Sequence, residues 1–534
     1  MCSARAAGRP LSRWAECGVD GVATGGAARA TARPRRAWPV TAGTVVGVVR
    51  VDGLGISELP PRRPGPLPGD LPLEVAALQV LAAGEDAGQE AETDDLVAQG
   101  LGAVVFFASA LRDPDRAASR SAALQAAALR GPAVSPLLLA ADEEGGRVCR
   151  LPLSPATMPG AMALAAAGGG ADLARTAGRA TAGRLAAVGV NWNLAPVCDL
   201  WAAENPALGS RCFARAPALA AELAAAFAQG LRDGGVAACA KHFPGHGATA
   251  VDSHEALPVL DADLALLRRR EWLPFAAAVR AGVETVMTGH LLAPALGLEP
   301  ASLSSTVTRA LREELGFTGV VVTDALGMSG CLRYAGDVGR AAVLALHAGA
   351  DVALVGHGPA EQRQARDALV AAVRAGRLAR ERLDEAVGRV WALKEALGLA
   401  RKGASQPAAA SHLLARPADV DLARWIALRS ITELAPGPRC ARPATIRAGE
   451  GAAPALLAAV RGRWPQAREE PPSRDAPPGC VTLDARCHLL VGLPVPSTLP
   501  AGGVLLAYDA TPASLAALLA CATGEAEAGG RLPL

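Results

Sequence analysis

The chain has 534 residues, of which 51% are hydrophobic and only 3% aromatic, so its core must be built mainly from Ala, Leu and Val. This length allows two or three domains, or one α/β barrel with a smaller unit. The 53 basic and 51 acidic residues give a net charge of +2, a balance that provides no reason to expect nucleic acid or an anionic membrane as a partner.

Three further features bear on the cellular context. The eleven cysteines are odd in number and include no C-x-x-C pair, which favours reduced thiols in a cytoplasm over a disulfide framework. No run of about 18 apolar residues is present, so no transmembrane helix is expected. Residues 1–40 contain seven arginines and two acids but no apolar core of a secretory signal, and are interpreted as a disordered, Arg-rich tail.

From about residue 41, short apolar or β-branched runs alternate with longer Ala/Leu/Arg stretches of helical spacing. Eight of these runs predict strands, at 45–51, 103–107, 137–141, 188–194, 236–240, 284–288, 320–323 and 352–355. Between them, helices are predicted at 172–187, 216–233, 263–281 and 306–315, among others. Eight strands separated by helices predict a (β/α)8 TIM-like barrel over residues 41–400.

A barrel of this type has its active site at the C-terminal ends of its strands. Six of the predicted strands have polar side chains at or near that end: Asp142, Glu143 and Glu144 at the third, Asn193 and Asp199 at the fourth, Lys241 and His242 at the fifth, His290 at the sixth, Asp324 at the seventh and His357 at the eighth. Any single one can be a structural cap. Six such strand ends together indicate an active site.

The region after the barrel begins with a linker, predicted at 401–411 from its Gly, Ser, Gln, Pro and Ala content. Residues 412–534 then combine helical stretches with strand candidates at 489–491 and 504–508. This pattern predicts a second, smaller α/β domain, in which no catalytic constellation is evident.

The densest run of reactive side chains is the stretch 241–254, KHFPGHGATAVDSH. A proline and two glycines prevent a helix there and predict a long loop after the fifth strand. A metal site is one interpretation, with His242, His246, Asp252 and His254 as possible ligands, although a His-x-x-x-His pair works best on a helix. A polar loop with local hydrogen bonds is the second interpretation.

Acid–base chemistry is the third interpretation of this loop. Asp252 and His254 are two residues apart, so in an extended loop both side chains can lie on one face. The carboxylate can then fix the tautomer of the imidazole and stabilise its protonated form, which provides a proton donor near neutral pH.

The same stretch resembles the signature Lys-His-Phe-Pro-Gly-His-Gly-x-Thr-x-x-Asp-Ser-His of bacterial β-N-acetylglucosaminidases in glycoside hydrolase family 3. One departure is Ala248, where family members usually have Asp. The resemblance implies a (β/α)8 barrel, and the C-terminal region resembles the sandwich-like second domain of two-domain members.

The resemblance also implies the catalytic residues. Residues 323–328, Thr-Asp-Ala-Leu-Gly-Met, are similar to the family's nucleophile motif, which makes Asp324 the expected nucleophile. His254 is the expected acid/base, with Asp252 as its orienting partner. The alternative that Asp324 only caps the following helix stays open.

Five residues match family positions that hold the terminal N-acetylglucosamine: Asp142, Arg150, Arg211, Lys241 and His242. Arg211 stands in Arg-Cys-Phe-Ala, where the family usually has Arg-Ser-Phe-Gly, and the Asp-Pro that follows in the family is Ala-Pro here. These departures leave the shape of the Arg211 loop open.

We therefore expect a retaining exo-β-N-acetylglucosaminidase that forms a covalent glycosyl–Asp324 intermediate and uses no metal or organic cofactor. The expected substrate is a small carbohydrate, a muropeptide or chitin-type fragment met in the cytoplasm. The alternatives are a phosphorylase, a β-glucosidase and a catalytically impaired sugar-binding relative, the last suggested by the departures at Ala248 and around Arg211.

Overall fold

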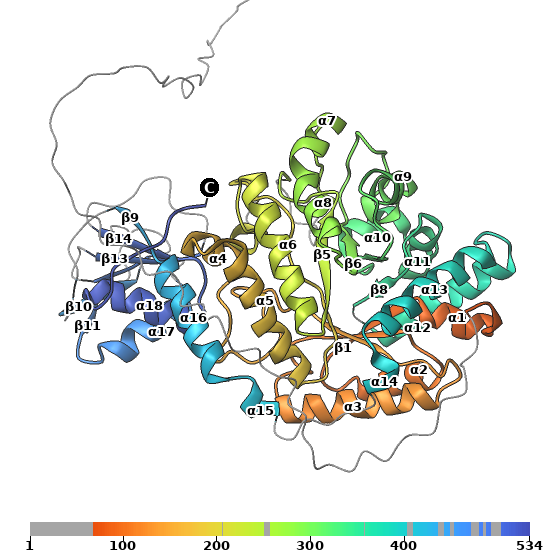
Figure 1. Cartoon of the computed structure of the whole chain (residues 1–534), viewed down its shortest axis with the longest axis horizontal. Coiled ribbons are helices and arrows are strands. Elements are labelled where there is room, and N and C mark those ends of the chain that lie inside the picture. Colours follow the sequence, from red (N-terminus) through yellow and green to blue (C-terminus); the bar gives the residue numbers. More distant parts are fainter. Residues whose placement is uncertain are drawn as a thin grey trace, which may run out of the picture. The chain divides into compact units, whose positions relative to one another are not determined.

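The computed structural model contains two β-sheets (Figure 1). It describes only part of the chain, in several segments of residues. These residues are 68–205, 207–249, 257–356, 358–402, 410–435, 440, 443–448, 453–470, 480–483, 487–492 and 503–533. The predicted tail at 1–40 and the predicted strand at 45–51 lie outside them, as do Asp252, His254 and His357.

The larger sheet has eight parallel strands in the order β7-β6-β5-β4-β3-β2-β1-β8. Their bounds are β1 Leu81–Glu85, β2 Ala103–Phe106, β3 Leu138–Ala141, β4 Trp192–Asn193, β5 Ala237–Phe243, β6 Thr285–Thr288, β7 Val320–Thr323 and β8 Ala353–Val355. A parallel bridge between Val322 and Val352 joins the two ends of the order. The sheet is thus a nearly closed TIM-like barrel, as predicted.

Seven of the eight predicted strands match barrel strands, but the first does not. The barrel begins with Leu81–Glu85, not with residues 45–51. The run Leu-Ala-Ala-Gly-Glu has no β-branched residue and contains a glycine, so its local strand signal is weak. Close packing explains the glycine, because a Cβ on Gly84 would lie 1.7 Å from the carbonyl oxygen of Gly356.

Helices follow the strands and cover the outside of the barrel (Figure 1). They are α1 Leu73–Gln79, α2 Glu90–Ala98, α3 Pro114–Arg130, α4 Ala161–Ala167, α5 Gly170–Ala187, α6 Pro217–Asp233, α7 Leu264–Leu266, α8 Trp272–Arg280, α9 Ser305–Arg309, α10 Ser329–Ala335, α11 Val338–His347, α12 Pro359–Arg374, α13 Arg380–Ala396 and α14 Leu399–Lys402. π-helical turns at Leu267–Glu271 and Ala310–Glu314 interrupt two of the predicted helices. Capping is local: Asp113 accepts from two backbone amides at the start of α3, which also has proline as its first residue.

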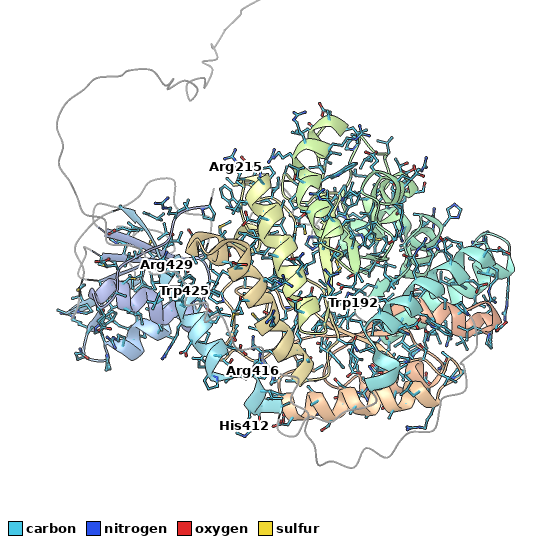
Figure 2. The ribbon with its side chains drawn as sticks, viewed as in Figure 1. Trp192, Arg215, His412, Arg416, Trp425 and Arg429 are labelled. Carbon is cyan, nitrogen blue, oxygen red and sulfur yellow. The ribbon has the colours of Figure 1, made fainter. Side chains whose placement is uncertain are left out.

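The barrel interior is filled by side chains from alternating strands. Trp192 is fully buried there, and its Nε1 donates to Thr285 Oγ1 on β6 at 2.9 Å (Figure 2). At the N-terminal end of the strands, Val390 and Leu393 of α13 belong to the same apolar core. The barrel is therefore a packed core that is closed at this end.

The smaller sheet has six strands in the order β11-β10-β12-β13-β14-β9. The strands are β9 Thr432–Ala435, β10 Thr445–Ala448, β11 Arg468–Glu470, β12 Cys480–Leu483, β13 Cys487–Val491 and β14 Gly503–Ala507. The helices of this domain are α16 Pro417–Ser430, α17 Pro454–Arg463 and α18 Pro512–Thr523, whereas the short α15 Ala410–Leu413 packs against α3 and α5 of the barrel. This confirms the second, smaller α/β domain. The limits predicted for the tail, barrel, linker and second domain remain predictions.

No helix in the described ranges is both long enough and apolar enough to cross a membrane.

Candidate active site

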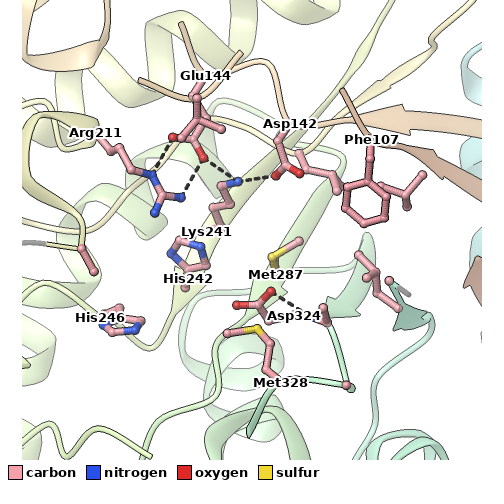
Figure 3. A pocket seen from close by; sticks show the side chains of 18 of the residues that line it. Phe107, Asp142, Glu144, Arg211, Lys241, His242, His246, Met287, Asp324 and Met328 are labelled. Atoms are coloured by element: carbon pink, nitrogen blue, oxygen red, sulfur yellow. Dashed lines mark hydrogen bonds and ion pairs between the residues drawn. The ribbon is translucent and has the colours of Figure 1, made fainter. Parts of the chain in front are cut away.

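A cavity of about 730 Å³ lies at the C-terminal ends of the barrel strands (Figure 3). Its lining includes six of the eight predicted site residues, Asp142, Arg150, Arg211, Lys241, His242 and Asp324. The other two, Asp252 and His254, lie outside the described residues. Apolar side chains complete the wall, with Met287 and Met328 beside Asp324 and Phe107 toward Asp142.

Lys241 is the centre of the polar side of the cavity. Its Nζ lies 2.7 Å from Asp142 Oδ1 and 2.7 Å from Glu144 Oε1, and only 2% of the side chain is exposed. Arg211 donates to both oxygens of Glu144 at 2.8 Å, a bidentate pair. Arg150 completes the group at 3.6 Å from Asp142. All five side chains are thereby held in one orientation around the cavity.

Mutual attraction keeps these groups charged although they are buried. Burial disfavours the charge on Lys241, but Asp142 and Glu144 outweigh it and raise the pKa of the amine above its usual value. Burial likewise opposes ionisation of Glu144, but Arg211 and Lys241 hold the pKa of this carboxyl well below its usual range. The cavity therefore presents fixed charges, which make strong directional bonds to hydroxyl groups.

His242 is oriented by Asp199, a residue after β4. Asp199 Oδ2 lies 2.7 Å from His242 Nδ1, and the pKa of Asp199 is lowered because the two histidines His242 and His246 outweigh its burial. A carboxylate only accepts, so Nδ1 bears the hydrogen. The pairing of β5 with β6 shifts register between Lys241 and Phe243, which lets two consecutive side chains line the cavity.

Asp324 follows β7 and faces the same cavity. Its Oδ1 accepts from the backbone amide of Ala325 at 2.8 Å. Burial opposes its ionisation, but His290, His242, the Ala325 amide and Lys241 together lower its pKa below the usual value. The side chain is therefore an ionised, oriented carboxylate among apolar neighbours. The alternative that Asp324 only caps a helix does not fit, because the residue before α10 is Met328.

Glu143 holds the loop that contains Arg150 through hydrogen bonds to its backbone. Glu143 Oε2 accepts from the amides of Arg150 and Leu151 at 2.8 and 3.1 Å, while its Oε1 pairs with Arg184 at 3.0 Å. Both Glu143 and Arg184 are 1% exposed. A buried ion pair thus fixes the backbone that presents Arg150 to the cavity.

The sequence assigns no specific role to two residues of this site, Glu144 and Asp199, and offers His246 only as a possible metal ligand. Glu144 and Asp199 were noted only as polar residues near strand ends, which was the available signal. His246 lines the cavity, with its Nδ1 2.8 Å from Thr249 Oγ1, and burial lowers its pKa.

Among the described residues, no group of three His, Cys, Asp or Glu side chains is placed to hold a metal ion, so no cluster there supports the metal interpretation. Its four candidate ligands include Asp252 and His254, which are not among those residues. In His242 and His246, Nδ1 is already hydrogen-bonded.

Comparisons with known proteins identify related sequences. Residues 71–393 match the model of the glycosyl hydrolase family 3 N-terminal domain. A β-hexosaminidase of Methylococcus capsulatus is 40% identical over 226 residues, which cover 42% of this chain and 67% of the relative. One of Thiobacillus denitrificans is 35% identical over 297 residues, 54% of this chain and 79% of the relative.

Solved structures are also similar. The structure of a glycoside hydrolase family 3 β-N-acetylglucosaminidase from Paenibacillus sp. str. FPU-7 matches with a TM-score of 0.76 at 32% identity, over 87% of this chain and 98% of that chain. A β-N-acetylhexosaminidase from Beutenbergia cavernae matches with a TM-score of 0.55 at 30% identity, over 61% of this chain and 99% of that chain.

Proposed function

The chain belongs to glycoside hydrolase family 3 and is a glycoside hydrolase, and from this premise we propose that it is a retaining exo-β-N-acetylglucosaminidase. One observation supports this most: Asp324 lies in the same cavity as the Asp142–Lys241–Glu144–Arg211 network. A carboxylate able to attack an anomeric carbon thus faces a set of fixed charges able to hold the sugar hydroxyls.

In the first step, the ionised Asp324 attacks the anomeric carbon and forms a covalent glycosyl ester, while the departing oxygen receives a proton. The proton donor in this proposal is His254, oriented by Asp252. In the second step, the imidazole takes a proton from water, and the hydroxide displaces Asp324 with net retention. The depressed pKa of Asp324 suits it to the nucleophilic role, because it stays ionised at neutral pH.

Sugar recognition in this proposal falls to Asp142, Arg150, Arg211, Lys241 and His242. The Arg150 side chain lines the cavity and is 29% exposed, so its guanidinium group is accessible to a ligand. Arg211 and Lys241 both pair with the carboxylate of Glu144, and these ion pairs fix the positions of the two side chains. Such preorganised donors favour a polyhydroxylated ligand in one pose.

The proposed substrate is a terminal β-linked N-acetylglucosamine of a muropeptide or chitin-type fragment, met in the cytoplasm. The β-hexosaminidase and β-N-acetylglucosaminidase names of the relatives support the sugar. The described cysteines are free thiols, most of them buried, which suits the proposed compartment.

The direct test is hydrolysis of an aryl N-acetyl-β-glucosaminide, with NMR of the first-formed anomer. We expect the β-anomer, and an α-anomer as first product would contradict the covalent mechanism. Mass spectrometry after reaction with a slow fluorinated sugar should place the label on the peptide that contains Asp324. Repeating the assay with phosphate separates hydrolysis from phosphorolysis, because only the latter yields a sugar 1-phosphate.

The acid/base role of His254 has its own test. His254→Ala should slow substrates with poor leaving groups far more than activated aryl glycosides, because only the former need a proton on the departing oxygen. An equal loss on both substrate types would argue against a proton donor at this position.

A further inference from the structure

The second domain contains a buried carboxylate that reaches the barrel. Asp509 follows β14 and is only 1% exposed. Its Oδ1 accepts from Thr511 N within its own domain at 3.1 Å, and its Oδ2 accepts from the backbone amide of Gly160 at 2.8 Å. Gly160 lies directly before α4 of the barrel, so this hydrogen bond joins positions 349 residues apart.

The Gly160 backbone is in turn packed against the loop that presents Arg150. Gly146, in that loop, has φ +61°, and a Cβ on it would lie 2.7 Å from Gly160 Cα and 3.2 Å from Asp509 Oδ2. The amide of Gly146 donates to Met158 O at 3.0 Å. Gly146 therefore fits into a narrow gap, one wall of which is the Asp509 carboxylate.

The second loop in contact with this domain is the one that bears Arg211. The C-terminal segment accepts a hydrogen bond there, from Arg215 N to Pro533 O at 3.2 Å (Figure 2). Apolar side chains from both domains form one buried cluster, with Met162, Val197, Trp201, Leu208 and Cys212 from the barrel and Cys480, Leu490, Leu506 and Tyr508 from the second domain. Cys212 is fully buried in this cluster, which accounts for an apolar thiol at the residue after Arg211.

Helix packing extends the same contact, since α16 of the second domain packs against α4. Arg150 and Arg211 lie on separate loops. Arg150 pairs with Asp142 and Arg211 pairs with Glu144, so the two loops belong to one network of charges. Both loops thus contact the second domain.

We propose that the second domain is part of the sugar-binding apparatus, with Asp509 as a positioning residue that holds the Arg150 loop in its binding geometry. This inference rests on the proposed function, because it assigns Arg150 and Arg211 to the sugar. It gives a role to a domain that contributes no side chain to the cavity lining in the described structure. Loss of the Asp509–Gly160 bond frees the loop and weakens sugar binding more than it slows the bond-breaking step.

The test compares Asp509→Ala, Asp509→Asn and Thr511→Ala in the full chain with an aryl N-acetyl-β-glucosaminide. Asp509→Ala should raise KM roughly tenfold or more, with a smaller change in kcat, because a misplaced loop costs binding geometry. Asp509→Asn keeps an acceptor for the Gly160 amide and should restore most of the affinity. Thr511→Ala removes the side-chain cap of α18 without touching the barrel, so it should lower Tm and leave KM unchanged.

The dissociation constant of N-acetylglucosamine, measured by calorimetry, should follow the same order in the three variants. Unchanged KM and dissociation constant in Asp509→Ala would overturn this inference alone, as would an equal rise in Thr511→Ala. If Asp509→Ala does not fold, a KM raised tenfold or more in Asp509→Asn, which keeps the acceptor for the Gly160 amide, would overturn it. A wild-type chain that neither hydrolyses the glycoside nor binds the sugar would overturn the proposed function, and this inference with it.

Discussion

Two networks of charge lie at opposite ends of the barrel, and they are alike in density but not in surroundings. At the C-terminal ends of the strands, Lys241 joins Asp142 and Glu144 beside a cavity. At the N-terminal ends, the fully buried Asp351 before β8 accepts from Arg312, Arg382 and Arg389 at 2.6, 2.7 and 2.9 Å.

The difference lies in what remains available for a ligand. Asp351 also accepts from the amide of Val321, so two oxygens serve four donors and the group is closed. In the network at the C-terminal ends, the Arg150 side chain is 29% exposed and lines the cavity, and Asp324 lines the same cavity. A cluster of charges therefore marks a site only where the fold leaves space beside it and keeps some of its polar groups accessible.

The largest expected effect is on Asp324. Asp324→Ala should lower kcat for an aryl N-acetyl-β-glucosaminide by at least about 10³-fold, because it removes the attacking carboxylate. Circular dichroism should show an unchanged fold. Turnover near the wild-type rate would place the nucleophile elsewhere.

Removing the central carboxylate of the network at the N-terminal ends, which we call the lower network, should affect stability instead of catalysis. Asp351→Asn removes the buried carboxylate that three guanidinium groups share, although Arg382 and Arg389 keep Glu385 as a partner, and should lower the free energy of unfolding by about 3–5 kcal/mol. Urea denaturation at pH 7 measures this, with kcat determined at a temperature where the variant stays folded. A reduced kcat with unchanged stability would mean that the lower network takes part in catalysis.

Exchanging one cation for another sharpens the comparison. Arg211→Lys keeps the charge but loses the bidentate pair with Glu144, and should lower kcat/KM by about ten- to hundredfold, mainly through KM. Arg312→Lys is the matched control in the lower network and should leave kcat/KM unchanged. Equal losses in both variants would point to a general effect on the barrel.

The smallest effect concerns Lys394, a fully buried lysine near the N-terminal ends of the strands. It donates to Gln79 Oε1 and Ser135 Oγ, both neutral, and burial lowers its pKa from 10.5 to about 7. Its charge is therefore a cost to the folded state that is complete below pH 7 and shrinks as the pH rises toward 10.5.

Lys394→Met should accordingly raise the free energy of unfolding by roughly 1–3 kcal/mol at pH 6, with a smaller gain at pH 9. Gln79 Oε1 keeps a donor in the variant, from Trp391 Nε1 at 2.7 Å. Denaturation curves at the two pH values provide the measurement. A gain that is the same at both pH values would contradict the lowered pKa, because it would mean that the amine is protonated to the same extent in the folded and unfolded states.

Local patterns were enough to predict much of this molecule. Seven strands followed from short apolar runs such as 320–323, since a buried parallel strand needs apolar side chains on both faces. The rule that barrel sites lie at C-terminal strand ends then predicted that Asp142, Lys241 and Asp324 would meet, and the cavity contains all three. The motif resemblance predicted family membership correctly.

Other features depend on partners far apart in the chain. The strand Leu81–Glu85 has a weak local signal and is selected because its backbone pairs with β2 and β8. Glu144 joins Lys241 and Arg211 across 67 or more positions, and Asp199 orients His242 from 43 residues away. Hydrogen-bond partners at such separations are chosen by packing in three dimensions, which no local pattern of side chains encodes. The contact from Asp509 to Gly160 is the extreme case, because it joins two separate domains.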